Sequence, residues 1–385
     1  MLPEGWRHAT LSDLISGNIR NGYSPNSAAA KTGYWVLSLG ALTDSGINSE
    51  EIKPVEPEPK VLQSLLRNGD FLISRSNTPD KVGRSIRFTG EIHNCSYPDL
   101  MMRFRANEEL VAPSYLEAVL KSFKVKTYFR KSAAGSSASM VKINKTTVEK
   151  TPIYLPPLPE QKKIAEILST WDKAIETVEK LIENSQQKKK ALMQQLLTGK
   201  KRFPEFDGEW KDSPLNKLCS ISKGTQLNRS ELSEAGDFPV INGGIEPSGY
   251  TDSSNCPKDT ITVSEGGNSC GFVNLIRQSF WCGGHCYALS NLKIDRQYLY
   301  HYLKFSEHKI MRLRVGSGLP NIQKKAIESV KVSAPDLTEQ KMIAKSLDAV
   351  DNEVALQRFF LEFFKSQKKA LMQQLLTGKR RVQVD

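Results

Sequence analysis

Long hydrophobic runs are missing from this sequence of 385 residues. No stretch approaches the roughly 20 apolar residues that a bilayer-spanning helix requires, and the first residues, MLPEGWRHATL, lack the apolar segment of a secretory signal. The sequence therefore predicts neither a membrane-spanning nor a secreted protein, and we expect a cytoplasmic location. Its six cysteines, four of them between Cys256 and Cys286, are accordingly expected to be reduced thiols.

Sequence signatures of catalysis are also missing. The chain contains no GxxxxGK[ST] phosphate-binding loop, and no GxGxxG follows a predicted strand. Only five histidines occur, and none has an evident serine, cysteine or aspartate partner in the sequence. We therefore expect a binding protein that has no catalytic residues and no cofactor or metal ion of its own.

One cluster has the composition of a metal site, the segment CGGHC at 282–286. Zinc takes about four nitrogen or sulfur ligands, and Cys256 or Cys270 would complete such a set. Against this, no second pair of cysteines with matching spacing accompanies the cluster, and the following YAL has the character of a buried strand. Core thiols are the favoured interpretation, and a catalytic zinc site is the alternative.

Positive charge is abundant and unevenly distributed. The formal net charge is +12, and residues 186–202 and 365–381 each contain six basic side chains and no acidic one. Concentrated positive fields attract polyanions such as nucleic acids. A solvated helix end is the alternative interpretation of either window. Under the first interpretation, the runs at 188–190 and 200–202 follow DNA or contact a partner protein.

The two basic windows belong to an internal repeat. The segment KKALMQQLLTGKKR at 189–202 returns as KKALMQQLLTGKRR at 368–381, with one substitution in fourteen positions. At the same offset of 179 residues, EQK at 160–162 matches EQK at 339–341, without gaps in between. From Ile164 and from Ile343, mostly apolar residues recur in alternating steps of four and three, which is the seam of a coiled coil.

Each copy therefore predicts one long helix. Prolines precede both copies, and Gly199 and Gly378 follow them as C-terminal stops. A helix over 160–198 is roughly 58 Å long at 1.5 Å per residue, and its narrow apolar stripe needs a partner. We expect the two copies to pair antiparallel within one chain, which would place two globular domains at opposite ends. Parallel pairing between two protomers is the alternative.

The segments around the helices predict an α+β fold with two mixed α/β domains related by a pseudo-two-fold axis. Tyr115-Leu116 matches Tyr298-Leu299, and INK at 143–145 matches IQK at 322–324. Short helices are predicted over 114–129 and 296–312. Strands are predicted over 34–39, 71–75, 85–89, 100–104, 238–241, 260–264, 271–275 and 286–289. Glycine-rich segments at 135–137 and 316–318 are either phosphate-contacting loops or simple turns.

The duplicated order of domain and helix resembles the specificity (S) subunit of type I restriction-modification systems. LPEQ at 158–161 with the segment 189–202, and LTEQ at 337–340 with the segment 368–381, are the residues that support the resemblance. The similarity extends over essentially the whole chain. It implies a first target recognition domain over 1–155, a central helical spacer over 156–202, a second recognition domain over 203–334 and a C-terminal helical spacer over 335–385.

The resemblance also implies a function. Each recognition domain would read one half of a split double-stranded DNA target, and the antiparallel coiled coil would hold the two readers apart. Two half-sites about one helical turn apart, near 34 Å, suit such an arrangement. Two methyltransferase (M) subunits would bind the chain and use S-adenosylmethionine, and a restriction (R) subunit would use ATP and Mg²⁺. A coiled-coil scaffold for other proteins, without sequence-specific DNA binding, is the alternative.

Sequence readout requires forked donors and amides at base edges. We select polar and basic residues of the predicted loops as candidates for DNA contact. In the first domain these are Arg75, Asn77, Lys81, Arg84, Lys142 and Lys145. In the second domain they are Lys223, Gln226, Asn228, Asn242, Asn268, Arg314, Asn321 and Lys324.

Overall fold

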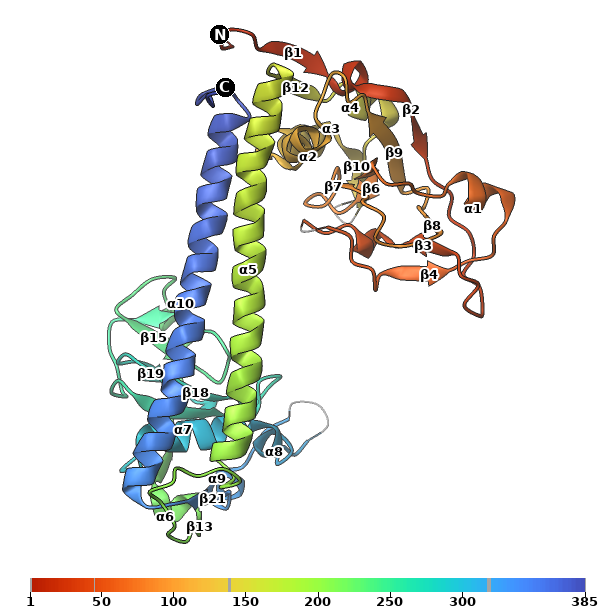
Figure 1. Cartoon of the computed structure of the whole chain (residues 1–385). Helices are drawn as coiled ribbons and strands as arrows, with labels where there is room; N and C mark the ends of the chain where they lie inside the picture. Colours follow the sequence, from red (N-terminus) through yellow and green to blue (C-terminus); the bar gives the residue numbers. More distant parts are fainter. Residues whose placement is uncertain (1, 45, 138–139, 317–319, 385) are drawn as a thin grey trace. The chain divides into compact units, whose positions relative to one another are not determined.

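The computed structural model describes residues 2–44, 46–137, 140–316 and 320–384. It divides into two compact units, unit 1 (Met1–Thr177 with Leu361–Asp385) and unit 2 (Val178–Phe360). Each unit contains one globular domain and one half of each long helix, α5 (Leu158–Leu196) and α10 (Leu337–Leu375). Both helices are labelled in Figure 1. The predicted bounds of the first long helix were correct to within two residues.

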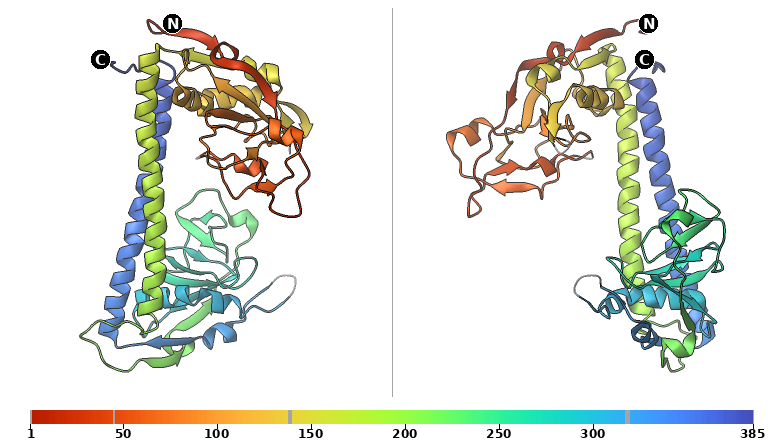
Figure 2. Two further views of the ribbon diagram at one scale, coloured as in Figure 1. Left: turned by 45° about the vertical axis from the view of Figure 1, so that its right-hand side comes forward. Right: turned by 180° about the vertical axis from the view of Figure 1, so that it is seen from behind.

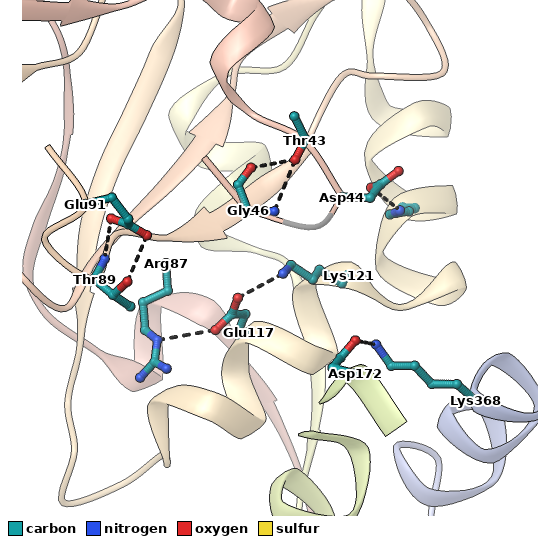
Figure 3. Close-up of polar contacts among 11 residues, drawn as sticks. Thr43, Asp44, Gly46, Arg87, Thr89, Glu91, Glu117, Lys121, Asp172 and Lys368 are labelled. Carbon is teal, nitrogen blue, oxygen red and sulfur yellow. Dashed lines mark hydrogen bonds and ion pairs between the residues drawn. The ribbon is translucent and has the colours of Figure 1, made fainter. Parts of the chain in front are cut away.

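The two long helices run antiparallel within each unit. In unit 1, the rings of Trp171 and Phe364 lie 5.8 Å apart edge to face, and Lys368 bonds the Asp172 carboxylate (Figure 3). In unit 2, Lys189 lies 2.5 Å from Asp351. The positions that the 3.5-residue spacing predicted as a seam are buried or half-buried in both helices. Pairing within one chain, as expected from the repeat, therefore needs no second protomer.

An ion pair with a buried carboxylate connects the start of each long helix to the end of the other copy of the repeat. In unit 1, Glu160 is 2% exposed and accepts hydrogen bonds from the Arg381 guanidinium at 2.8 and 3.2 Å. In unit 2, Glu339 is fully buried and accepts from Arg202 at 2.6 and 3.0 Å. Forked carboxylate–guanidinium pairs are strong and geometrically specific. Arg202 of the run at 200–202 is therefore engaged within the protein, and a contact of this run with DNA or a partner stays a prediction.

The glutamine after each of these glutamates joins the helix to its globular domain. Gln161 accepts a hydrogen bond from the backbone N–H of Ala112 at 2.8 Å, just before α2 (Pro113–Lys121). Gln340 accepts in the same way from Asp295 at 2.9 Å, just before α7 (Arg296–Phe305). Both glutamines also donate to a proline carbonyl oxygen upstream. The repeated EQ pair is thus a structural joint.

Unit 1 is built on a four-stranded antiparallel sheet with strand order β2-β9-β5-β7. Smaller sheets have the orders β4-β3-β8, β1-β12 and β10-β11-β6. Glu117 of α2 pairs with Arg87 of β7 at 3.3 Å and with Lys121 at 2.9 Å, which fastens α2 against the sheet edge (Figure 3). The strands are β1 (Arg7–Thr10), β2 (Ile15–Asn21), β3 (Trp35–Leu37), β4 (Ile52–Pro54), β5 (Asp70–Ser74), β6 (Ser76–Asn77), β7 (Ser85–Arg87), β8 (Cys95–Ser96), β9 (Met101–Ala106), β10 (Ala134–Ser137), β11 (Met140–Lys142) and β12 (Pro152–Leu155).

Unit 2 repeats this plan. Its main sheet has the order β14-β20-β17-β18, and its smaller sheets have the orders β16-β15-β19 and β13-β21. The strands are β13 (Lys211–Pro214), β14 (Ser220–Lys223), β15 (Phe238–Ile241), β16 (Tyr250–Thr251), β17 (Thr260–Ser264), β18 (Val273–Ile276), β19 (Trp281–Cys282), β20 (Cys286–Ser290) and β21 (Lys331–Ala334). The shorter helices of the two units are η1 (Leu11–Leu14), η2 (Leu39–Ala41), α1 (Pro59–Gln63), α3 (Phe123–Ser132), α4 (Lys145–Glu149), α6 (Leu215–Leu218), η3 (Arg229–Glu231), α8 (Glu307–Met311) and α9 (Lys324–Glu328).

In each unit the main core joins the sheet to the helix pair. In unit 1, Leu168 of α5 and Leu375 of α10 are buried in the same cluster as Phe71 of β5. In unit 2, Leu347 of α10 and Leu196 of α5 are buried with Tyr298 of α7. Both ends of the chain lie in unit 1, near the start of α5 (Figure 2). None of the helices within the described residues combines the length and the apolarity that crossing a membrane requires.

Two predicted helices are interrupted at a serine. The helix predicted over 114–129 is α2 followed by α3, and Ser122 begins α3 by accepting from the Val125 N–H. The helix predicted over 296–312 is α7 followed by α8, with Ser306 between them. Serine competes with the backbone for hydrogen bonds and favours helix starts, which periodicity alone does not reveal. The strand predicted over 271–275 begins only at Val273.

A buried histidine in unit 2 predicts a pH dependence of stability. His301 of α7 is fully buried and donates to Asp348 of α10 at 2.9 Å. Burial lowers the pKa of His301 below its ordinary 6.5, and the charge on Lys189 adds to this, although Asp348 and Asp351 oppose both. As the pH falls, His301 is therefore protonated in the unfolded chain before it is protonated in the folded one. The contribution of His301 to the unfolding free energy is full above pH 6.5 and decreases as the pH falls below it.

We expect the melting temperature of the chain to decrease between pH 6.5 and 5, and the decrease to be smaller for His301→Gln. His308→Gln is the control, because His308 is exposed on α8 of the same unit. Thermal melts at a series of pH values check this. An unchanged pH dependence in His301→Gln would contradict it.

Candidate nucleic-acid interface

Both main sheets carry a loop of the same construction after their third strand. In unit 1, the Gly83 N–H donates to the Ser74 carbonyl oxygen at 2.8 Å and closes the loop that follows β5. In unit 2, the Gly271 N–H donates to the Ser264 carbonyl oxygen at 2.9 Å after β17. Both glycines have a positive φ, +74° and +89°, which a side chain would strain. Ser74 and Ser264 therefore occupy equivalent positions.

A hairpin is fastened to each of these loops. In unit 1, β10 and β11 form the hairpin, β11 pairs with β6, and Ile143 donates to the Arg75 carbonyl oxygen at 2.8 Å. In unit 2, Val315 bridges Asn321, and Ile322 donates to the Glu265 carbonyl oxygen at 2.8 Å. Arg75 and Glu265 are thus equivalent in position and opposite in charge. Of the predicted glycine-rich loops, 135–137 lies in β10, whereas 317 and 318 lie outside the described residues.

A second loop, which leads into the neighbouring strand β9 or β20, reaches the same end of the main sheet. In unit 1, the Arg75 N–H donates to the Leu100 carbonyl oxygen at 2.9 Å. In unit 2, the Glu265 N–H donates to the His285 carbonyl oxygen at 2.9 Å. The segments 97–101 and 282–286 are therefore equivalent, and the first contains no cysteine. We call the following parts of each unit its loop surface: this end of the main sheet, the loop after β5 or β17, the hairpin, and the segment 97–101 or 282–286.

The predicted residues of unit 1 gather on its loop surface. Arg75 and Asn77 adjoin Lys142 through the pairing of β6 with β11, and Lys81 lies in the same loop. Lys81 and Lys142 are exposed and form no ion pair within the described residues. Lys145 follows on α4 and pairs with Glu149 at 3.6 Å. These basic groups can contact phosphates or base acceptors.

Two of the predicted residues of unit 1 are already engaged within the protein. The Arg84 guanidinium donates to the Leu42 carbonyl oxygen at 3.0 Å and lies 3.6 Å from Asp44. The Asn77 amide accepts from the Thr78 N–H at 2.9 Å and donates to the Ser74 hydroxyl at 3.3 Å. Both side chains therefore hold the loop in shape and offer fewer free donors than the sequence interpretation assumed.

Unit 2 presents a carboxylate at the corresponding place. Glu265 accepts a hydrogen bond from Lys223 at 2.6 Å and from the Tyr287 hydroxyl at 3.0 Å, and His285 lies 3.5 Å away. Burial acts to raise the pKa of Glu265, but these donors hold it below its ordinary value. The predicted Lys223 is therefore part of a polar cluster whose acceptor the sequence did not reveal.

The other predicted residues of unit 2 are distributed around this cluster. The Asn242 side-chain oxygen accepts from the His285 N–H at 3.1 Å, and Gln226 adjoins Gly284. Asn268 is exposed in the loop after β17. Asn321 forms an antiparallel bridge with Gly266 of the same loop. The remaining three lie further along the same segments. Asn228 precedes η3, Arg314 precedes the Val315 bridge, and Lys324 begins α9 and pairs with Glu328 at 3.6 Å.

The cysteines of the segment 282–286 belong to the core. Cys282 and Cys286 are each 1% exposed, and hydrogen bonding to Cys256 and to Cys286, together with burial, raises the pKa of the Cys282 thiol. His285 turns outward toward Glu265 instead of joining the sulfurs. Within the described residues, the group of three side chains placed closely enough to share a metal ion is instead His301 with Asp348 and Asp351. The geometry favours core thiols over zinc.

Sequence reasoning did not select Glu265, and it considered His285 only as part of the CGGHC segment at 282–286. It also missed Asp99 of the segment 97–101 in unit 1 and Ser24, whose hydroxyl donates a hydrogen bond to the Asp99 carboxylate. An alignment of the two domains that placed Ser74 on Ser264 would have found Glu265 opposite Arg75. The side chains that differ between two otherwise equivalent loops are the natural candidates for different specificities.

Comparison with known proteins agrees with this duplicated architecture. Residues 3–184 and 207–361 match the family model of the type I restriction modification DNA specificity domain. The type I restriction enzyme MjaX specificity subunit of Methanocaldococcus jannaschii is 31% identical, over 99% of this chain and 95% of the relative. The MjaVIII specificity subunit of the same organism is 28% identical over 73% of each.

Solved structures show the same fold. The S subunit of a type I restriction-modification system from M. genitalium superposes with a TM-score of 0.67, over 96% of both chains, at 17% identity. A chain from a structure of type I restriction-modification complex assembly and conformational transition gives a TM-score of 0.60, at 20% identity over 99% of this chain and all of that one. With two equivalent loop surfaces on duplicated sheets and a match over the whole length, the chain belongs to the family of type I restriction-modification DNA specificity subunits.

Proposed function

We propose that this chain is the DNA-reading subunit of its complex and that each unit reads one half of a bipartite double-stranded target. The observation that supports this most strongly is the repeated loop surface with different chemistry. Arg75 stands where unit 2 has Glu265, and Leu100 stands where unit 2 has His285. One scaffold with two sets of side chains is suited to two different half-sequences.

The two loop surfaces favour different base edges. Guanine presents two acceptors in the major groove, which suit the Arg75 guanidinium or Lys81 in unit 1. Cytosine presents an amino donor, which suits the Glu265 carboxylate in unit 2, and adenine suits a side-chain amide such as Asn242. The target is therefore expected to be asymmetric, with unrelated half-sequences.

Catalysis belongs to partner subunits in this proposal. The specificity subunit selects the site, the methyltransferase subunits use S-adenosylmethionine, and a restriction subunit, where present, uses ATP and Mg²⁺. These cofactors are predictions that follow from the family, whereas the cytoplasmic location is a prediction from the sequence, which lacks long apolar segments. The alternative of a coiled-coil scaffold without DNA specificity is not favoured by the relatives, which are DNA specificity subunits.

An apolar stripe on α10 supports a contact with a methyltransferase subunit. Leu356 and Phe359 are 56% and 65% exposed and share one face of the helix with Phe360. The corresponding positions of α5, 179 residues earlier, are threonine, lysine and leucine. Exposed aromatic groups of this kind mark interaction surfaces. We propose that two methyltransferase subunits bind the chain and that one of them covers this stripe.

The stripe predicts that one substitution can weaken assembly with the methyltransferase subunit without destabilising the fold of this chain. Phe359→Ser is expected to weaken co-purification of the methyltransferase subunit at least tenfold, because the lost aromatic contact would lie at the interface. It should leave the melting temperature of the isolated chain unchanged, since Phe359 is exposed there. Arg358→Ser is the neighbouring control. Undiminished co-purification of Phe359→Ser would contradict the contact.

If the loop surface of unit 1 binds DNA, replacing its lysines should change how DNA affinity depends on salt concentration. If Lys81 and Lys142 each contact a phosphate, replacing both by alanine removes about two units from the slope of log affinity against log salt concentration. Titration of a duplex that contains the target, from low to moderate salt, measures this slope. Lys162→Ala/Lys173→Ala on α5 is a matched control with the same loss of charge. Equal slopes for the loop variant and the unsubstituted chain would contradict the proposal.

A further inference from the structure

Unit 1 contains a cavity of about 570 Å³ in which four arginines meet. Arg20 of β2, Arg103 and Arg105 of β9, and Arg67 of the segment before β5 line it, together with Asp70. Pockets of this volume hold small molecules of nucleotide size. The cavity lies beside the first residue of β5, whereas the loop surface begins after its last, roughly 13 Å along the strand at 3.3 Å per residue.

A buried carboxylate holds two of the arginines in place. Asp70 is 1% exposed and accepts from Arg105 at 2.6 Å and from Arg103 at 3.4 Å. Arg103 also donates to the Leu65 carbonyl oxygen at 2.9 Å, and Arg105 donates to the Asn68 carbonyl oxygen at 3.2 Å. These bonds engage only part of the five N–H donors that each guanidinium carries. The two groups are therefore fixed in position and still have donors to offer.

The other two arginines add uncompensated charge. Within the described part of the chain, the guanidinium groups of Arg20 and Arg67 form no hydrogen bond or ion pair, and both residues are exposed. Four arginines and one aspartate leave three positive charges around the cavity. Guanidinium groups bind phosphate through paired donors, which makes such a cluster suited to a phosphate-bearing anion.

The fold itself does not require these charges. In unit 2, Ser222 pairs with Ala288 at the position where Arg20 pairs with Arg103 in unit 1. In the same way, Thr260 occupies the position of Asp70. Ser290 likewise replaces Arg105. The same sheet thus forms in unit 2 with uncharged side chains at these positions. Unit 1 also has an irregular register between Ser16 and Arg20, and residues of this stretch line the cavity.

We propose that this arginine pocket is a phosphate-binding site, separate from the loop surface that reads bases. Its ligand is a phosphate-bearing group of nucleotide size, either a free nucleotide or pyrophosphate, or a stretch of DNA backbone. The site does not depend on the assignment of half-sites to the two units. Its binding can therefore be measured on the isolated full-length chain, without methylation or base recognition.

Calorimetric titration with inorganic pyrophosphate tests the proposal. We expect saturable binding of one pyrophosphate per chain, weakened at least tenfold in Arg20→Gln/Arg67→Gln. These two side chains make no bonds within the described protein, so this variant should keep the thermal stability of the unsubstituted chain. Arg7→Gln/Arg130→Gln, two exposed arginines of unit 1 outside the pocket, is the control with the same loss of charge. Absence of saturable binding, or equal weakening in the control, would overturn the site.

A duplex titration with the same variants identifies the source of the phosphate. If DNA backbone is the ligand, Arg20→Gln/Arg67→Gln also lowers duplex affinity, and pyrophosphate competes with the duplex. If a free phosphate compound is the ligand, duplex affinity stays the same while pyrophosphate binding is lost. Both outcomes support the pocket, and neither depends on which bases the loop surfaces read.

Discussion

Alanine in place of Gly224 is expected to disrupt the loop surface of unit 2. A Cβ atom at this position would lie 2.3 Å from the carbonyl oxygens of both Cys282 and Gly283, which are backbone atoms. The Gly224 N–H also donates to Cys286 at 2.9 Å, so the segment 282–286 and the end of β14 must move apart together. Overpacking of this kind costs about 3 kcal/mol of unfolding free energy when the backbone has to shift.

We also expect a loss of DNA recognition, because the movement displaces His285 and the groups bonded to it. We expect Gly224→Ala to lose recognition of one half-site, and chemical denaturation to show the lower stability. Gly208→Ala is the matched control, since no atom lies within 4 Å of its added Cβ. A Gly224→Ala protein with ordinary stability and an unchanged target would contradict the tight approach.

Unit 1 contains the same close approach and provides an internal comparison. A Cβ atom on Gly22 would lie 2.1 Å from the Tyr97 carbonyl oxygen and 2.4 Å from that of Pro98. Gly22→Ala is therefore expected to have the same two effects, on stability and on recognition, but on the other half-site. The two glycines are equivalent in structure, although the segments that they approach share no sequence motif.

The long helices could be predicted from the sequence because their signals are local. A repeated 3.5-residue pattern, prolines before it and a glycine after it fix the helix and its apolar face. The start of the second copy depended on the match between EQ at 160–161 and EQ at 339–340. What these residues do was not predictable, because Glu160 bonds Arg381 and Glu339 bonds Arg202, far along the chain.

The loop surfaces were predicted only in part, because their equivalence is hidden by insertions. The offset between the units is 190 residues at Ser74 and Ser264, 188 at Gly83 and Gly271, and 179 at Ile143 and Ile322. A single offset therefore aligned the helices but not the loops. Polar residue type pointed to Lys81 and Lys142, which are exposed, but also to Arg84, whose donors are engaged internally. Side-chain bonding of this kind requires the folded neighbours.

The arginine pocket also could not be predicted from the sequence, because its residues come together only in the folded chain. Arg20, Arg67, Arg103 and Arg105 are spread over 86 residues of sequence, and none of them stands in a charge run. Only the pairing of β2 with β9 and of β9 with β5 brings Arg20, Arg103 and Arg105 together, and Arg67 joins them from the segment before β5. A search for basic windows therefore favoured the helix ends, where charge is dense in sequence but much of it is paired across the helices.

Reading of two half-sites by two separate units predicts that substitutions act on one half at a time. Arg75→Gln and Glu265→Gln form a matched pair, because the two residues occupy equivalent positions on their loop surfaces. Each should change the preference at one base pair by about 1–3 kcal/mol, roughly a factor of five to 150 in affinity. The other half-sequence and the gap between the halves should stay unchanged, because the second unit and both long helices are untouched.

The decisive measurement is long-read sequencing of methylated adenines in cells that express the chain, or either variant, with its methyltransferase subunit. The account predicts a split target in which Arg75→Gln relaxes one half and Glu265→Gln relaxes only the other. A contiguous target, or a variant of one unit that alters both halves together, would contradict the assignment of one DNA reader to each unit.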